Sequence, residues 1–177
     1  ATYEVGTDGF CRMGSLENGW WGYGGEGFSE ILVDGTNVST TTSSGPFVGI
    51  AQGTNATFQI PFTNPDNDLI RFRLATPSEA GVTGSNPTNL SIDPMTGLIT
   101  WDNSGLSQGS LHALQVIIEE YNQGDNPSNT QPKATVASDF IFKIGGTGNQ
   151  LPVCSFDPTS PVTIDLGQTV NIDVTGS

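Results

Sequence analysis

The feature that most constrains the fold of this chain is its succession of short apolar runs, each followed by glycine, proline, asparagine or aspartate. Within these runs apolar and polar residues alternate, as along a strand with one buried face, and no stretch has the periodicity of an amphipathic helix. Strands this frequent, with no helices between them, predict an all-β protein built as an antiparallel sandwich. The predicted strands cover residues 3–5, 28–33, 57–62, 69–75, 97–101, 112–121, 136–144, 162–166 and 169–174.

The charge balance is strongly acidic and narrows the range of partners. The chain has 18 Asp and Glu residues against five Lys and Arg residues, a formal net charge of −13. Nucleic acids and anionic membranes recruit clustered basic residues, so neither is an expected partner. No apolar run reaches the roughly 18 residues of a membrane span. Abundant Gly, Ser, Thr and Asn beside few charged residues is typical of extracellular β proteins, and we expect an extracellular or cell-surface location.

Composition divides the chain into three predicted regions. Residues 1–45 form a head that is rich in glycine and aromatic residues and contains β structure. Residues 46–148 contain a complete set of strands for one sandwich domain, and residues 149–177 hold a loose linker and two further strands.

The last region repeats the opening strands of the sandwich domain. "TVNIDVT" at 169–175 aligns its apolar residues with those of "TFQIPFT" at 57–63. Two strands cannot bury an apolar face alone, so another surface must cover them. Either the tail is the truncated start of a further repeat, or it is a donor strand that completes the sandwich of a partner. The inserted side chains would be Val162, Ile164, Leu166, Val170, Ile172 and Val174.

Four segments occur in an order that resembles a known family: "NPDNDLIRFRLA", "LSIDPMTGLITW", "LQVIIEEYNQG" and "ASDFIFKI". They resemble the cadherin-like and Ig-like repeats of bacterial surface, adhesin and fibril proteins, over about half of the chain. The resemblance implies a seven-stranded sandwich. It also implies roles in adhesion, spacing and assembly, often with calcium bound between repeats.

An oxygen-rich loop lies between two predicted strands. Asn64, Asp66 and Asp68 offer two carboxylates and an amide, and calcium takes six to eight such oxygens. In the resembling fold the loop after "VIIEEY" lies nearby and would add Glu120 and Asn122. Asn64 replaces the aspartate that begins the family's motif. A calcium site is therefore one interpretation of the loop, and a solvated Asx-rich turn is the other.

The segment "GWWGYGGEGF" at 19–28 interleaves aromatic residues with glycine. If Trp20, Trp21 and Tyr23 are exposed, their flat amphipathic rings suit stacking on sugars. If they are buried, they belong to a core or to a contact between subunits. Both interpretations remain open from the sequence.

Several residues are candidates for glycosylation in a secreted chain. N-x-S/T sequons occur at Asn37, Asn55 and Asn89. The run "STTTSSGP" at 39–46 suits either an O-glycosylated segment or a plain linker. Its candidate acceptors are Thr40, Thr41 and Thr42.

The two cysteines, Cys11 and Cys154, fit no metal-binding spacing and suggest a disulfide. The bridge would join two subunits, close within one chain or use a partner outside it.

"GLSQG" at 105–109 matches the G-x-S-x-G nucleophile pattern but lacks the strand–turn–helix context which that chemistry needs, so we expect no enzyme.

The sequence thus favours a structural subunit of a secreted fibril or adhesin stalk. Copies would assemble head-to-tail into a linear filament by strand donation, stiffened by calcium and carrying glycans. The alternative is a glycan-binding or spacer module of a larger secreted protein.

Overall fold

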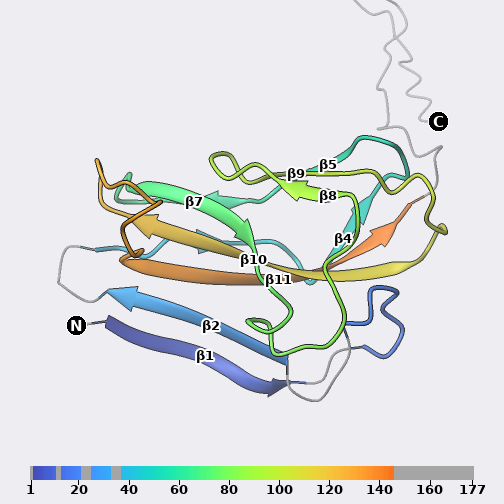
Figure 1. Cartoon of the computed structure of the whole chain (residues 1–177), viewed down its shortest axis with the longest axis horizontal. Coiled ribbons are helices and arrows are strands. Elements are labelled where there is room, and N and C mark those ends of the chain that lie inside the picture. Colours follow the sequence, from blue (N-terminus) through green and yellow to red (C-terminus); the bar gives the residue numbers. More distant parts are fainter. Residues whose placement is uncertain (1, 11–12, 21–24, 33–36, 146–177) are drawn as a thin grey trace, which may run out of the picture. The chain divides into compact units, whose positions relative to one another are not determined.

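The computed structural model describes residues 2–10, 13–20, 25–32 and 37–145, and every regular element in these ranges is a strand (Figure 1). The prediction of an all-β, antiparallel sandwich is confirmed. No helix in this part of the chain is long and apolar enough to cross a membrane. The strands are β1 (Thr2–Phe10), β2 (Gly25–Leu32), β3 (Thr41–Thr42), β4 (Phe47–Ile50), β5 (Ala56–Gln59), β6 (Phe62–Thr63), β7 (Leu69–Leu74), β8 (Leu90–Ile92), β9 (Leu98–Trp101), β10 (Leu111–Tyr121) and β11 (Ala134–Ile144).

The larger sheet has the order β1-β2-β11-β10-β7, and β4 also pairs with β11. Its centre is the long antiparallel pair β10–β11, which runs from Leu111 opposite Lys143 to Glu120 opposite Ala134. The edge of β11 that faces away from β10 pairs with two strands, β2 and β4. β2 pairs with it antiparallel near its start, and β4 pairs with it in parallel over its last four residues, 141–144.

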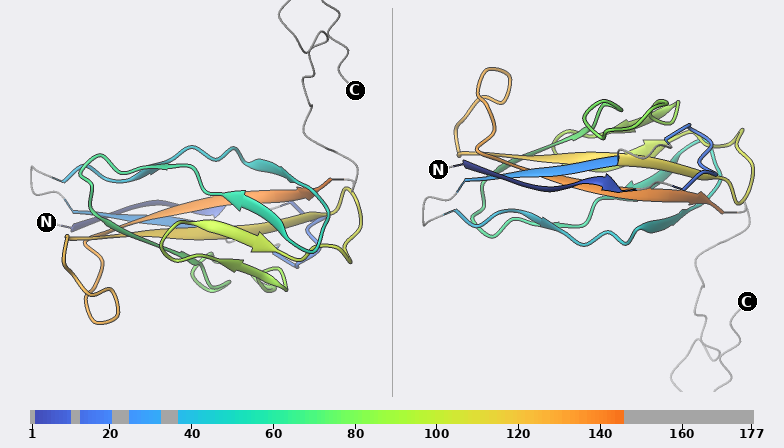
Figure 2. Two further views of the ribbon diagram at one scale, coloured as in Figure 1. Left: turned by 90° about the horizontal axis from the view of Figure 1, so that it is seen from above. Right: turned by 90° about the horizontal axis from the view of Figure 1, so that it is seen from below.

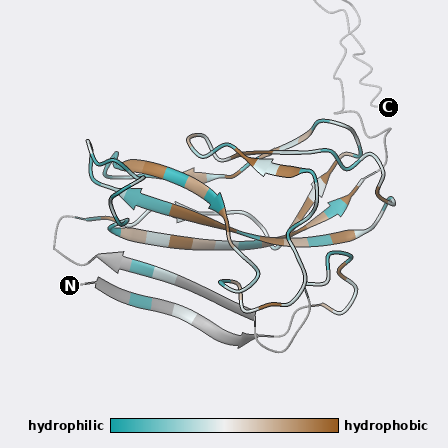
Figure 3. Cartoon of the chain, in the orientation of Figure 1, coloured by the Kyte–Doolittle hydropathy of each residue, from teal (hydrophilic) through white to brown (hydrophobic). Residues whose placement is uncertain are grey.

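A smaller sheet of order β5-β9-β8 packs on the larger one, and β3 and β6 form a separate two-residue pair. Seen edge-on, the sheets lie in layers (Figure 2). Aromatic rings fill the space between them: Phe58 lies 5.6 Å from both Phe140 and Phe142, centroid to centroid, and Trp101 lies 5.6 Å from Phe142. Apolar residues mark the strands that face this core (Figure 3). Burial of such rings is the main source of the fold's stability.

The "DPMTG" segment forms the turn that its sequence predicts. Oδ1 of Asp93 accepts hydrogen bonds from the main-chain N–H groups of Met95 and Thr96, at 2.9 and 2.7 Å. Gly97 takes φ = 71°, a conformation that glycine adopts without strain. The turn thereby delivers the chain into β9.

Residues of the predicted head belong to the same unit as the sandwich. Trp20 is fully buried and packs in one cluster with Leu16, Ala80 and Ala113. The Asn18 amide donates to the carbonyl of Ala113 and accepts from its N–H, at 2.8 and 3.1 Å, which fixes this segment on β10. The chain divides instead between residues 147 and 148, so the boundary expected at residue 45 does not separate two units. Residues 148–177 lie outside the described residues.

Candidate functional site

The oxygen-rich loop between β6 and β7 is an Asx-type turn held by its own amides. Asn64 donates from Nδ2 to the carbonyl of Asp68 at 2.8 Å and accepts from the N–H of Asp68 at 3.1 Å. Asn67 has φ = 57°, a left-handed conformation that asparagine tolerates better than most residues. The amide oxygen of Asn64 is thus engaged by the main chain.

Asp68 has a protein cation as its partner. The ammonium group of Lys133 forms an ion pair with Oδ2 of Asp68, and both side chains are only 12% exposed. Lys133 lies directly before β11, and its main-chain N–H donates to the carbonyl of Glu120 at 2.8 Å. The strand order β11-β10-β7 therefore brings together two residues that are 65 positions apart.

Glu120 is a buried carboxylate on the inner side of β10, 2% exposed. Its Oε1 accepts hydrogen bonds from the main-chain N–H and the hydroxyl of Thr40, at 3.0 and 2.8 Å. Its Oε2 is buried and has no hydrogen-bond partner among the residues that the structure describes. This carboxylate fixes β10 to the segment that precedes β3.

Each of the five predicted calcium ligands has a hydrogen-bond or ion-pair partner in the protein. Asp66 accepts from the N–H of Val38 at 2.6 Å, and Asn122 donates to Asp125. Nowhere in the described ranges do three His, Cys, Asp or Glu residues group around a position for a metal ion. Hydrogen-bond partners and the Lys133 ammonium thus engage an atom of each predicted ligand, and calcium at this loop stays a prediction.

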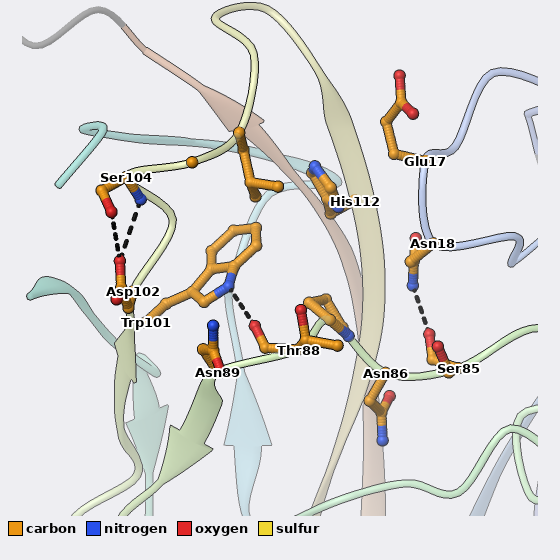
Figure 4. Close-up of a pocket in the computed structure, with 13 residues that line it drawn as sticks. Glu17, Asn18, Ser85, Asn86, Thr88, Asn89, Trp101, Asp102, Ser104 and His112 are labelled. Atoms are coloured by element: carbon orange, nitrogen blue, oxygen red, sulfur yellow. Dashed lines mark hydrogen bonds between the residues drawn. The ribbon is translucent and has the colours of Figure 1, made fainter. Parts of the chain in front are cut away.

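A second candidate site is a cavity of about 580 Å³ at the other end of β10 (Figure 4). Trp101 and His112 form its floor in edge-to-face contact, with ring centroids 5.2 Å apart. The indole N–H of Trp101 donates to the carbonyl of Thr88 at 3.0 Å, which fixes the ring. The walls come from residues 17–18, the segment 85–89 before β8 and the loop after β9.

The polar groups of this cavity are mainly acidic or neutral. Burial lowers the pKa of His112, and the nearby carboxylate of Glu17 offsets this only in part. The imidazole is therefore neutral at pH 7, with one ring nitrogen that donates and one that accepts. Hydrogen bonds from the hydroxyl and N–H of Ser104 lower the pKa of Asp102, which stays ionised.

The predicted aromatic platform for sugars is not formed at Trp20. That side chain is fully buried, so its faces are covered by protein and the core interpretation holds for it. Trp21 and Tyr23 lie outside the described residues.

The structure separates accessible glycosylation candidates from inaccessible ones. Asn55, Asn89 and Thr41 are exposed. The amide atoms of Asn37 are buried, and the hydroxyl of Thr40 is bound to Glu120, so neither can accept a sugar in this conformation. The hydroxyl of Thr42 donates to the carbonyl of Pro61 at 2.8 Å. The Ser/Thr run is thus partly a strand and not a plain linker.

Two groups of predicted residues lie outside the described part of the chain. Cys11 and Cys154 are both among them. So are the proposed donor-strand residues Val162, Ile164, Leu166, Val170, Ile172 and Val174.

Strand β1 forms one edge of the larger sheet. It pairs with β2 in regular antiparallel register from Thr2 to Thr7, after which the register shifts. In the described ranges no strand pairs with its other side. The remaining sheet edges are shorter or covered: β5 and β8 have four and three residues, and the N–H of Phe72 in β7 donates to the carbonyl of Pro94 at 3.0 Å.

Sequence reasoning missed the roles of Lys133 and His112. Lys133 is one of only five basic residues. It precedes a strand that lies two places from the strand after the acidic loop, and this was a usable signal for an ion pair. His112 is the only histidine, but nothing in the local sequence places it beside Trp101 or Glu17.

No protein-family model and no curated protein matches the chain. Among solved structures, a Bacteroides fragilis protein provisionally named an alpha-galactosidase is 16% identical with a TM-score of 0.39, over 65% of this chain and 19% of that one. The human desmocollin-1 ectodomain is 18% identical with a TM-score of 0.36, over 87% of this chain and 32% of that one. The chain thus spans less than a third of either protein. At these TM-scores neither protein assigns a family or an activity to it.

Proposed function

We propose that this chain is a structural subunit of an extracellular fibril or adhesin stalk, in which residues 162–174 of one copy add as a strand to β1 of the next. The observation that carries the proposal is the edge of β1, nine residues long and paired on one side only in the described ranges. An edge strand of this length is a template for another chain, because its outward N–H and C=O groups have no partner within the sheet.

The chemistry of β1 supports strand addition. β1 contains no proline, so every residue has a main-chain N–H to donate. Its register with β2 is regular from Thr2 to Thr7, and this stretch would therefore receive the donor. The shift that follows twists the strand and ends the acceptor at a defined point.

The tail has the pattern that a donor requires. Apolar residues alternate at Val170, Ile172 and Val174, so all three fall on one side of an extended strand. Residues 146–161 separate β11 from the first donor residue and reach roughly 50 Å when extended. A span of that length allows the tail to reach a second copy.

The contact joins two different surfaces, the tail of one copy and β1 of the next. Such a heterologous contact repeats without closing when the rotation between copies is not a simple fraction of a turn. The product is an open linear filament, consistent with a stalk or fibril.

Replacing Ile172 by aspartate tests the donor. A charge on the inserted side would need to be buried without a partner, and we expect the Ile172→Asp chain to remain monomeric while the parent chain grows into large species as its concentration rises. Light scattering after size-exclusion chromatography gives the mass, and 18.6 kDa is the monomer.

Asn171→Asp is the matched control, because it adds the same charge on the opposite side of the strand. It should assemble as the parent does. Hydrogen exchange then locates the acceptor, with slower exchange at Thr2–Thr7 in the assembled protein. Assembly by Ile172→Asp, or a parent chain that stays at 18.6 kDa at every concentration, would refute the proposal.

A further inference from the structure

Lys133 and Asp68 bring an amine and a carboxyl group into contact in a largely buried position. The Nζ atom of Lys133 contacts Oδ2 of Asp68, and both side chains are only 12% exposed, so water has little access to the contact. An amine and a carboxyl group can condense to an amide with the release of water. Two groups held in a fixed orientation react as if each were present at an effective concentration on the order of 10⁵ M or more.

A third reactive group, the carboxylate of Glu120, lies on the strand between these two residues. β10 lies between β7 and β11 (Figure 1), and on it Glu120 pairs with Ile70 of β7 and Ala134 of β11. Ile70 follows Asp68 by two residues, and Ala134 directly follows Lys133. The main-chain carbonyl of Glu120 also accepts a hydrogen bond from the N–H of Lys133 at 2.8 Å. Glu120 is therefore next to both residues in the sheet.

The side chain of Glu120 has the features of a proton carrier. It is 2% exposed, and its Oε1 is held by the N–H and the hydroxyl of Thr40 at 3.0 and 2.8 Å. Its Oε2 is buried and has no hydrogen-bond partner in the described part of the chain. A buried carboxylate oxygen without a partner is costly for the fold and rare. Beside a lysine and an aspartate it supplies a base for the proton that amide formation releases.

We propose that Lys133 and Asp68 form an intramolecular isopeptide bond, with Glu120 carrying the proton. A proton first passes from Nζ to Oδ2 along their hydrogen bond, which gives a neutral amine and a carboxylic acid. Nζ then attacks Cγ of Asp68 while Oε2 of Glu120 takes a proton from Nζ. The C=O bond re-forms, the C–O bond to the hydroxyl group breaks, and Glu120 returns its proton to this hydroxyl, which leaves as water. The products are an amide and one water molecule, so the step consumes no co-reactant.

The bond would close a covalent ring across β7, β10 and β11, between residues that are 65 positions apart. Such a ring limits the unfolded chain as a disulfide does. All three residues belong to the unit that ends at residue 147, so the bond does not depend on strand donation by the tail. A stalk built from such subunits would keep β7 and β11 tied together even after their hydrogen bonds to β10 break.

The mass of the full chain tests the bond directly. The chain is produced in a host that does not glycosylate it, and its cysteines are reduced before the measurement. We expect a mass below that of the sequence by one water molecule, even after denaturation.

Digestion with trypsin locates the bond, because trypsin cuts after Lys and Arg but not after a lysine whose Nζ is part of an amide. The bonded chain should give a branched peptide in which residues 13–71 are joined to residues 74–143. A chain without the bond gives 13–71, 74–133 and 134–143 as separate peptides.

Lys133→Arg and Lys143→Arg are a matched pair of variants. Arginine keeps the positive charge in both, but its guanidinium group does not condense with a carboxyl group. Lys133→Arg should therefore have the full mass of its sequence. Lys143 is exposed on β11, so Lys143→Arg should lose one water molecule as the parent does.

Glu120→Gln tests the proton carrier. Glutamine still offers an oxygen to Thr40 but does not take up the proton, so we expect the bond to form at least about a hundredfold more slowly. The bonded fraction is followed by mass in freshly synthesised chains, and near-ultraviolet circular dichroism checks that the variant folds as the parent does.

A parent chain with the full mass of its sequence would overturn the proposal, as would a lost water molecule that maps to other residues or persists in Lys133→Arg. A folded Glu120→Gln chain that forms the bond at the parent's rate would remove Glu120 from the reaction. None of these results depends on whether the chain assembles.

Discussion

Lys133 forms an ion pair with Asp68, one of the predicted calcium ligands. Its ammonium group lies on Asp68, and each side chain is 12% exposed, so the charge of the carboxylate is balanced by a residue directly before β11. An ammonium group supplied by the chain is permanently present, whereas a bound metal depends on its concentration outside the protein. The sequence suggested a cation at this loop, and the structure places the Lys133 ammonium on one of the predicted ligands.

Replacing Lys133 by methionine should destabilise the fold. Methionine keeps most of the apolar volume but leaves Asp68 largely buried without its cation, which we expect to lower the free energy of unfolding by about 2–4 kcal/mol. Urea denaturation measures the loss. Lys143→Met is the control, because Lys143 is exposed on β11 and should change stability by less than about 0.5 kcal/mol. Equal effects of the two variants would contradict a structural role for the Lys133–Asp68 pair.

At the scale of elements, the turn between β8 and β9 lies close against a residue of β7. A Cβ built on Gly97 would lie 2.9 Å from ring atoms of Phe72, a buried residue of β7. Gly97 also has φ = 71°, which alanine adopts with strain. The glycine therefore permits both the turn and the close approach of the Phe72 ring.

Gly97→Ala should lower the free energy of unfolding by about 1–3 kcal/mol, from backbone strain and the displaced ring together. Thermal and urea unfolding provide the measurement. In Gly105→Ala, the matched control, the added methyl group meets no atom within 4 Å, and no loss is expected. A Gly97→Ala protein as stable as Gly105→Ala would show that the turn relaxes freely.

The sequence predicts the strands that carry alternation and misses those that do not. Runs such as "FIFKI" in β11 and "LIRFRL" in β7 alternate and were placed within one or two residues. β3, β4, β6 and β8 have only two to four residues, too few for a period to be visible, and their partners lie far along the chain. Glycines in β1 and β2 resemble loop residues, so the length of that hairpin was underestimated.

The cavity was missed because its residues come from four separate segments.

At the scale of the whole molecule, the division between residues 147 and 148 predicts that the sandwich folds without the tail. A chain ending at residue 147 should unfold within a degree or two of the parent, because it keeps every core residue of the described part of the chain. It should also fail to assemble. Calorimetry and light scattering test the two statements separately.

A chain ending at residue 139 is the control for this truncation. It lacks Phe140, Phe142 and Ile144, three buried members of the core, and should not fold. If truncation at 147 is as damaging as truncation at 139, then residues 148–177 are part of the folded unit and the division is wrong.

The parallel pairing of β4 with β11 has a mechanical consequence. Phe47 lies opposite Ile141 and Ile50 opposite Ile144, so the two strands run side by side in the same direction. A pull on the chain before β4 and after β11 draws these strands past each other lengthwise, and their hydrogen bonds are loaded together in shear. Bonds loaded together break in one concerted event at high force, whereas an antiparallel hairpin pulled from its open end separates bond by bond. Tension applied at these two points would therefore load the four residue pairs together.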